Sequence, residues 1–137
     1  MTAEDARAYA PYGGKSLHEQ SHGESFLALL KNRFFRRGFY VLDEPEAALS
    51  PQRQLSFLVL IHDLLENNNE IQFLIATHSP IILAFPGAQI LSFDGERIHE
   101  IEYEDTSSSQ VYSRFLGDRE NFLRQLFAEL DFRRSES

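Results

Sequence analysis

Two adjacent carboxylates follow a short apolar segment in the first half of the chain. Asp43 and Glu44 come directly after residues 39–42, which read Phe-Tyr-Val-Leu. Such a run, closed by acids and a proline, is typical of a strand buried on both faces of a parallel sheet. One carboxylate there could hold Mg²⁺ through water, and the other could orient or deprotonate a water that attacks a phosphoryl group. Taken alone, the pair is more often an acidic loop that closes a strand.

A histidine follows a second predicted buried strand, at residues 71–76. His78 would lie near Glu44 if the two strands were neighbours, because ligand sites form outside the carboxyl ends of parallel strands. Its imidazole could donate a hydrogen bond to a phosphate or help to hold the attacking water. In isolation, a loop histidine is more often merely solvated.

A serine- and glycine-containing segment precedes the first predicted helix, at residues 24–37. Ser21, Gly23 and Glu24 lie in the sequence Ser-His-Gly-Glu-Ser, where a hydroxyl, a glycine and a helix start together favour an anion site. The same residues also fit a helix N-cap box. Both interpretations can hold, since a cap uses the amides that would grip a phosphate.

The remaining elements alternate in the order expected of an α/β fold with a largely parallel core. Gly38 is placed as a C-cap glycine, and Ser50-Pro51 begins a helix that should run to about Glu66. The other predicted elements are a short helix at 80–85, a hairpin of 88–93 with 97–103 around Asp94-Gly95, and helices at 108–116 and 118–130.

Composition narrows the function classes. The chain has 137 residues, a net charge of −8 and no cysteine. The charge argues against broad attraction to nucleic acid or to anionic membrane, and the lack of cysteine excludes disulfides and thiolate metal sites. No apolar run approaches the length that spans a bilayer, so we expect no membrane insertion and a cytoplasmic location.

In their order along the chain, these motifs resemble the C-terminal half of an ABC-type ATPase head. Ser21–Ser25 is similar to the signature, residues 39–44 to Walker B with its catalytic glutamate, Ala48–Pro51 to the D-loop, and His78 to the switch histidine. Among such heads, the chain is most similar to soluble bacterial ATPases of the AAA_21 and SMC-like type, rather than to transporter cassettes.

This resemblance implies a partial P-loop NTPase fold that binds ATP and Mg²⁺ between two subunits. Asp43 would be associated with the metal, and Glu44 and His78 would serve catalysis on the chain's own nucleotide. The D-loop residue Ser50 and the signature residues Ser21, Gly23 and Glu24 would contribute to nucleotide binding, the signature acting in trans. The implied partner is a second ATPase head, as a homodimer, with DNA as a further partner only through the full assembly.

The phosphate-binding Walker A loop is missing from this pattern. Gly13-Gly14-Lys15-Ser16 is similar to the end of the Walker A pattern G-x-x-x-x-G-K-[ST]. The pattern also requires a glycine at position 9, where the chain has Tyr9. We therefore expect residues 1–20 to be a flexible segment and residues 21–137 to form the C-terminal half of an ATPase domain. Such a half-domain should bind ATP poorly and should leave part of the sheet near Val41 and Ile75 uncovered.

Two other function classes remain open at this point. A truncated head could be a non-catalytic dimerisation or interaction module. Less favoured is a Mg²⁺-dependent nuclease that uses Asp43, Glu44 and His78, since it would leave the signature-like and D-loop-like segments unexplained.

Overall fold

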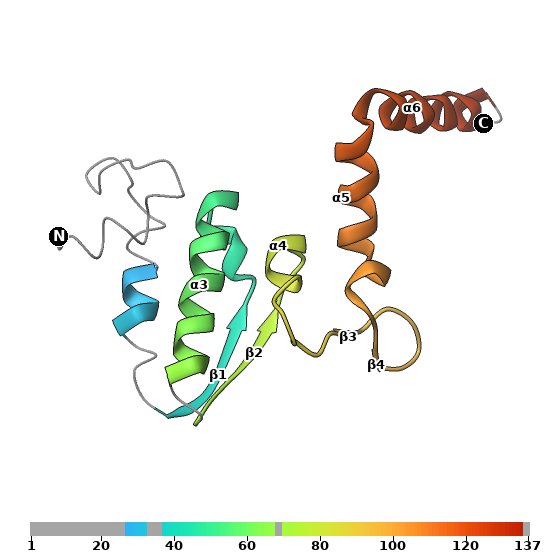
Figure 1. Cartoon of the computed structure of the whole chain (residues 1–137). Helices are drawn as coiled ribbons and strands as arrows, with labels where there is room; N and C mark the ends of the chain where they lie inside the picture. Colours follow the sequence, from blue (N-terminus) through green and yellow to red (C-terminus); the bar gives the residue numbers. More distant parts are fainter. Residues whose placement is uncertain (1–26, 33–36, 68–69, 136–137) are drawn as a thin grey trace. The chain divides into compact units, whose positions relative to one another are not determined.

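A computed structural model describes residues 27–32, 37–67 and 70–135 (Figure 1). The chain divides into two compact units, Met1–Thr77 and His78–Ser137, and each is described by itself. None of the helices within the described residues combines the length and the apolar character needed to cross a membrane. The predicted boundary between residues 20 and 21 lies outside the described residues and stays a prediction.

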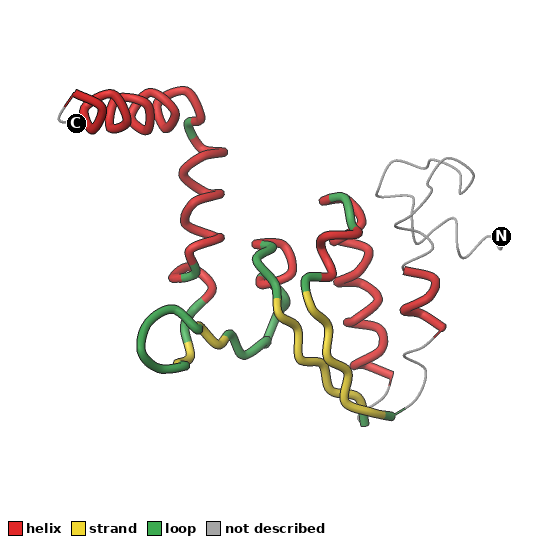
Figure 2. The backbone as a smooth tube through the Cα atoms, turned by 180° about the vertical axis from the view of Figure 1, so that it is seen from behind, coloured by secondary structure: helices red, strands yellow, loops and turns green. Residues whose placement is uncertain are grey.

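The first unit is built on two parallel strands. β1 (Gly38–Asp43) pairs with β2 (Ile71–Ala76), in a register that runs from Gly38 opposite Ile71 to Asp43 opposite Ala76 (Figure 2). Parallel neighbours need a long crossover connection, and here it consists of the short 3-10 helix η3 (Pro45–Ala48) and the helix α3 (Pro51–Asn67). The predicted α/β class and the parallel pairing of these two strands are confirmed.

Local hydrogen bonds at Ser50 and Asn67 fix the two ends of α3. The carbonyl of Ser50 accepts hydrogen bonds from the amides of Arg53 (2.9 Å) and Gln54 (3.0 Å). Pro51 suits the first helical position because proline has no N–H that would be left unpaired there. At the other end, the Asn67 side chain donates to the carbonyl of Asp63 at 2.7 Å. The predicted helix from Ser50-Pro51 to about Glu66 is therefore confirmed.

The core of the first unit lies between α3 and one face of the sheet. Gln54, Phe57 and Ile61 are the buried residues of α3, and their spacing of three and four places them on one side of the helix. Phe57 is fully buried at 0% exposure. The other buried apolar residues of this unit are Leu30, in a helical segment at residues 27–32, together with Leu49 and Ile71.

The two faces of the sheet differ, which corrects the prediction of strands buried on both faces. Residues paired across parallel strands point to the same face, so Tyr40 lies beside Phe73 on the face toward α3, with ring centroids 5.6 Å apart. The alternate residues form the open face, where Phe39, Val41 and Leu74 are all more than half exposed. A single crossover helix covers only one side of a sheet, and nothing within the described residues is packed on the other.

Two further expectations are resolved by this arrangement. Val41 is 63% exposed, so its predicted loss of cover is confirmed, whereas Ile75 is half-buried on the face toward α3.

Gly38 is not a helix C-cap residue. It opens β1, and its amide donates to the carbonyl of Glu70 at 2.9 Å, because pairing with the next strand satisfies its backbone in place of a helix end. The helix predicted for residues 24–37 is seen at 27–32, and the rest of it lies largely outside the described residues.

The second unit is a chain of short elements, each fixed by local hydrogen bonds. It contains α4 (Pro80–Leu83), β3 (Leu91–Ser92), β4 (His99–Glu100), the 3-10 helix η4 (Tyr103–Asp105), α5 (Ser107–Gly117) and α6 (Arg119–Ser135). The Tyr103 hydroxyl donates to the carbonyl of Pro80 at 3.0 Å, tying η4 to α4. Thr106 caps α5 by accepting from the Ser109 amide, and Asp118 caps α6 by accepting from the Asn121 amide.

The elements predicted for this unit are all present, with changed lengths. The hairpin is confirmed, but its ladder joins only Leu91 with Glu100 and Ser92 with His99. The connection is longer than a two-residue turn, and Gly95 adopts a φ of 104° within it. α4 is shorter than expected, while α6 continues well past the predicted end at Leu130.

A matched pair of substitutions tests the one-sided packing of the sheet. Phe57→Ala should lower the free energy of unfolding by about 3–5 kcal/mol, because a fully buried ring leaves a cavity. Phe39→Ala, on the open face, should lower it by less than about 1 kcal/mol. Urea unfolding followed by circular dichroism measures both. Equal losses would show that the open face is packed in solution.

Candidate functional site

The predicted acidic pair lies at the carboxyl end of the parallel strands. Asp43 is the last residue of β1, is exposed, and stands opposite Ala76 at the end of β2. The Glu44 amide donates to the carbonyl of Ala76 at 2.8 Å, which carries the pairing one residue past the strand. Both carboxylates therefore emerge where α/β sheets bind their ligands.

Glu44 has an unusual backbone conformation. Its φ of 44° and ψ of 54° place it in the left-handed region, and among the described residues it is the one non-glycine residue with a positive φ. That conformation costs roughly 1–2 kcal/mol for an L-residue, and Pro45 further restricts the residue that precedes it. Strain of this kind concentrates at functional sites, where the surrounding structure holds a side chain in a required direction.

The chain after Glu44 is fixed by buried contacts on both sides of Ser50. Pro45 and Leu49 are buried, and the Leu49 amide closes η3 by donating to the carbonyl of Glu46 at 2.9 Å. The buried Gln54 side chain donates to the carbonyl of Leu49 at 3.2 Å. Ser50 itself is exposed at the start of α3, so the D-loop-like segment presents a hydroxyl on a constrained backbone.

Gln54, whose buried side chain holds the Leu49 carbonyl, was not among the predicted residues. Its role depends on burial at the α3–sheet interface, since a glutamine in the first turns of a helix is usually solvated. The available signal was its place three residues before Phe57, on the apolar side of the helix.

His78 is the first residue of the second unit and is exposed. The following residue, Ser79, is buried and was not predicted to have a role. Its Oγ accepts hydrogen bonds from the amides of Ile81 (3.2 Å) and Ile82 (3.3 Å), which caps α4 and fixes the direction of the chain just after His78. The Ser-Pro pair at 79–80, like that at 50–51, was the signal for this cap. The predicted approach of His78 to Glu44 stays a prediction.

The signature-like residues Ser21, Gly23 and Glu24 lie outside the described residues, as does the imitation of Walker A at 13–16. The predicted site is thus described at Asp43, Glu44 and Ser50 in the first unit, and at His78 in the second.

The described carboxylates fit a magnesium ion only if water and phosphate supply most of its ligands. Within the described ranges, no group of three or more His, Asp or Glu side chains is gathered as a metal cage. Mg²⁺ commonly keeps several waters and is bound through one or two carboxylates plus phosphate oxygens. The exposed carboxylate of Asp43 at the strand end fits that manner of binding.

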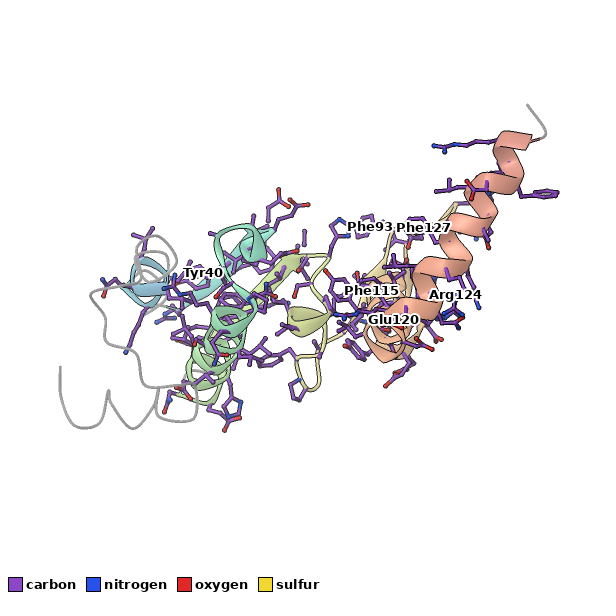
Figure 3. All side chains as sticks on the ribbon, turned by 90° about the horizontal axis from the view of Figure 1, so that it is seen from above. Tyr40, Phe93, Phe115, Glu120, Arg124 and Phe127 are labelled. Atoms are coloured by element: carbon purple, nitrogen blue, oxygen red, sulfur yellow. The ribbon has the colours of Figure 1, made fainter. Side chains whose placement is uncertain are left out.

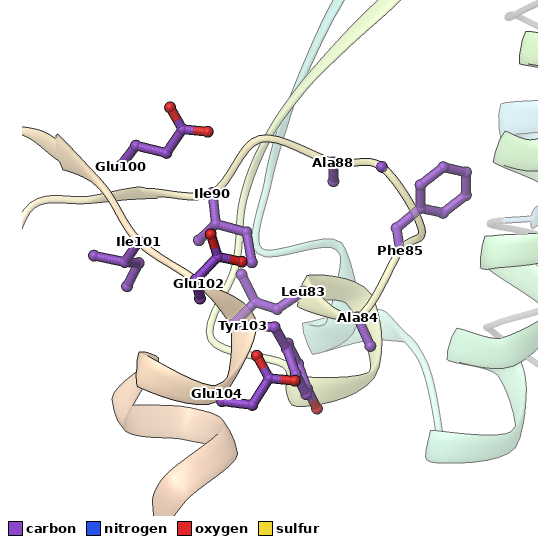
Figure 4. A pocket seen from close by; sticks show the side chains of 11 residues that line it. Leu83, Ala84, Phe85, Ala88, Ile90, Glu100, Ile101, Glu102, Tyr103 and Glu104 are labelled. Carbon is purple, nitrogen blue, oxygen red and sulfur yellow. The ribbon is translucent and has the colours of Figure 1, made fainter.

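A separate hollow of about 440 Å³ lies within the second unit (Figure 4). Its wall includes the carboxylate-bearing residues Glu100, Glu102 and Glu104, beside apolar residues such as Leu83 and Ile90. Carboxylates repel phosphate groups, so this hollow is unsuited to a nucleotide. None of the predicted site residues lines it.

The strain at Glu44 can be measured through stability. Glu44→Gly should be about 1 kcal/mol more stable than Glu44→Ala, because glycine avoids the left-handed penalty of roughly 1–2 kcal/mol and loses only about 0.4–1 kcal/mol through the unfolded state. The same two substitutions at Glu70 serve as the control, and there alanine should be the more stable. Urea unfolding gives the order of stabilities, and alanine proving the more stable at position 44 would contradict the strained conformation.

The comparisons with known proteins bear on the segment that holds this site. No curated protein matches the chain. Residues 18–83 match the family model of the AAA ATPase domain, and the matched segment contains Asp43, Glu44, Ser50 and His78. ATP binding and hydrolysis are the general activity that this family suggests. The match thus supports an AAA-type ATPase family for residues 18–83, and the parallel β1–α3–β2 unit is consistent with part of a P-loop NTPase fold.

Proposed function

We propose that this chain supplies the signature, Walker B, D-loop and switch-histidine part of an ABC-type ATPase head, in which ATP is bound between two subunits. The observation that carries the proposal is the placement of Glu44. Glu44, whose backbone is in the strained left-handed conformation, directly follows the exposed Asp43 at the carboxyl end of a parallel strand. ATP hydrolysis requires a group at this place that orients or deprotonates water.

The two acidic residues have different tasks. Asp43 would hold Mg²⁺ through water, and the bound magnesium would neutralise charge at the phosphates. Glu44 would accept a proton from the attacking water. Its backbone is fixed on one side by the hydrogen bond from its amide to Ala76 and on the other by the buried Pro45. A fixed backbone limits the directions open to the carboxylate, which favours catalysis by positioning.

The remaining motif residues are assigned by their places in the sequence. His78 would act beside the phosphates of the same nucleotide, a role assigned from its place in the sequence two residues after the second strand. Ser50 would face the second head from the D-loop. Ser21, Gly23 and Glu24 would contact the nucleotide of the partner head, through a hydroxyl and helix-start amides.

The open face of the sheet supports the view that further elements complete this domain. Parallel sheets are ordinarily covered on both faces, yet Phe39, Val41 and Leu74 are exposed together on one. We propose that the covering elements belong to the same ATPase domain and include the phosphate-binding loop. A non-catalytic interaction module would use the same apolar face. ATP hydrolysis by the assembled protein would distinguish an ATPase head from such a module.

Nucleotide affinity provides the first test. The chain of 137 residues should bind Mg-ATP weakly, at millimolar concentrations, because the lysine and amide cradle of Walker A are lacking. A chain extended by a segment that carries Walker A should bind it far more tightly. Calorimetric titration of both proteins gives the affinities. Tight binding by the shorter chain would contradict the assignment.

Catalysis is tested in the assembled, ATP-hydrolysing protein by Glu44→Gln. The substitution keeps shape and most hydrogen bonding but removes the base, so steady-state turnover should fall by about 10²–10⁴-fold while ATP affinity survives. The uncleaved ATP should also raise the dimer fraction in sedimentation. Asp43→Asn should instead weaken both magnesium-dependent binding and turnover.

The matched control for this experiment is Glu70→Gln. Glu70 carries the same group at the opposite end of the strands, where it forms an exposed ion pair with Arg37 at 3.3 Å. Its replacement should leave the rate unchanged. A Glu44→Gln protein that hydrolyses ATP as fast as the Glu70→Gln protein would rule out Glu44 as the base.

A further inference from the structure

An apolar stripe runs along α6, beyond the part of the chain assigned to ATP chemistry. Leu123, Leu126, Phe127 and Leu130 follow the spacing of three and four that places side chains on one face of a helix. Leu126, Phe127 and Leu130 are 42%, 55% and 45% exposed. Figure 3 shows α6 with Glu120, Arg124 and Phe127 labelled along it.

Among the described residues, few are packed on the outer part of this stripe. Where α6 meets α5, the rings of Phe115 and Phe122 meet edge to face, with centroids 5.7 Å apart. That contact lies at the first turn of α6 and leaves Leu126, Phe127 and Leu130 exposed further along. Since most helical stability in proteins comes from packing an amphipathic face, this exposed stripe is suited to an intermolecular contact.

We propose that α6 binds α6 of a second copy of this chain, with the two helices antiparallel. The contact would be isologous, so that each residue meets the same partner residue in both directions. With the two-fold axis beside Phe127, Leu126 of each copy packs on Leu130 of the other, and Phe127 lies beside its own copy.

The charges along α6 select the second copy and its orientation. In the antiparallel register centred on Phe127, Glu120 near one end of the helix faces Arg134 near the other end. A parallel pair would instead bring Arg119 and Arg133, which extend the stripe at its two ends, against their own copies. Like charges at such positions disfavour the parallel pair, and the helix dipoles also favour the antiparallel one.

The contact is small, which sets the affinity to be expected. A stripe of four apolar residues on each chain is smaller than a standard stable interface, so the dimer should be weak and concentration-dependent, in the micromolar range. Because α6 lies outside residues 18–83, this dimer should form without nucleotide. It is therefore separate from the nucleotide-bound dimer of the proposed function.

The first test is sedimentation equilibrium of the nucleotide-free chain. The unaltered protein should show a monomer–dimer equilibrium. Leu126→Lys should weaken dimerisation by about 100-fold or more, since each dimer loses two buried leucines. Phe132→Lys is the matched control. It places the same charge on α6 but on the side away from the stripe, and should change the dissociation constant by less than about twofold.

A further control concerns the open sheet face, which offers another apolar surface. Val41→Lys should leave the equilibrium unchanged if α6 forms the contact. A chain that stays monomeric at several hundred micromolar, or one whose dimer is lost with Val41→Lys and kept with Leu126→Lys, would overturn the proposal. Circular dichroism of each variant shows whether the helices are retained.

Charge reversal tests the orientation. Glu120→Arg and Arg134→Glu should each weaken the dimer by about tenfold, because each substitution replaces two attractive contacts with two repulsive ones. The double variant Glu120→Arg/Arg134→Glu should restore the original affinity in an antiparallel pair. Failure of the double variant to recover would overturn the antiparallel arrangement.

Discussion

The in-register parallel pairing of β1 with β2 is the constraint on which the candidate site depends. The ladder ends at Asp43 opposite Ala76, and the Glu44 amide adds one more hydrogen bond to the Ala76 carbonyl. Two acidic side chains are thereby held at the edge of the sheet where the chain leaves β1. The packing of Phe57 in the centre of the first unit secures α3 against the strands, so the crossover cannot shift without opening the core.

The packed side chains of the first unit lie on one side of the sheet. The face toward α3 combines the stacked rings of Tyr40 and Phe73 with the buried Phe57 and Ile61. The opposite face leaves Phe39, Val41 and Leu74 in contact with solvent. Parallel sheets ordinarily bury both faces, so the exposed one marks where the proposed ATPase domain would need further structure.

The connection after β1 shows how local strain and burial act together. Glu44 occupies a left-handed conformation, and the buried Pro45 and Leu49 hold the chain that follows it. Gln54 links the Leu49 carbonyl to α3 by a buried hydrogen bond, which fixes the segment around Ser50. The stability of the crossover helix thus offsets the unfavourable backbone at the residue proposed as the catalytic base.

The sequence by itself determined the local elements. Apolar runs between polar loops located both strands, and Ser50-Pro51 located the start of α3, because a cap and a proline act over a few neighbouring residues. The order of motifs led to the ATPase interpretation. Tertiary structure decided the pairing, the burial and the sheet face of residues that contact distant segments of the chain. Gly38 pairs with β2 instead of capping a helix, Gln54 is buried beneath the loop, and Val41 and Ile75 lie on opposite faces of the sheet. Local propensity could not settle these points, since each depends on which distant segment packs against the residue.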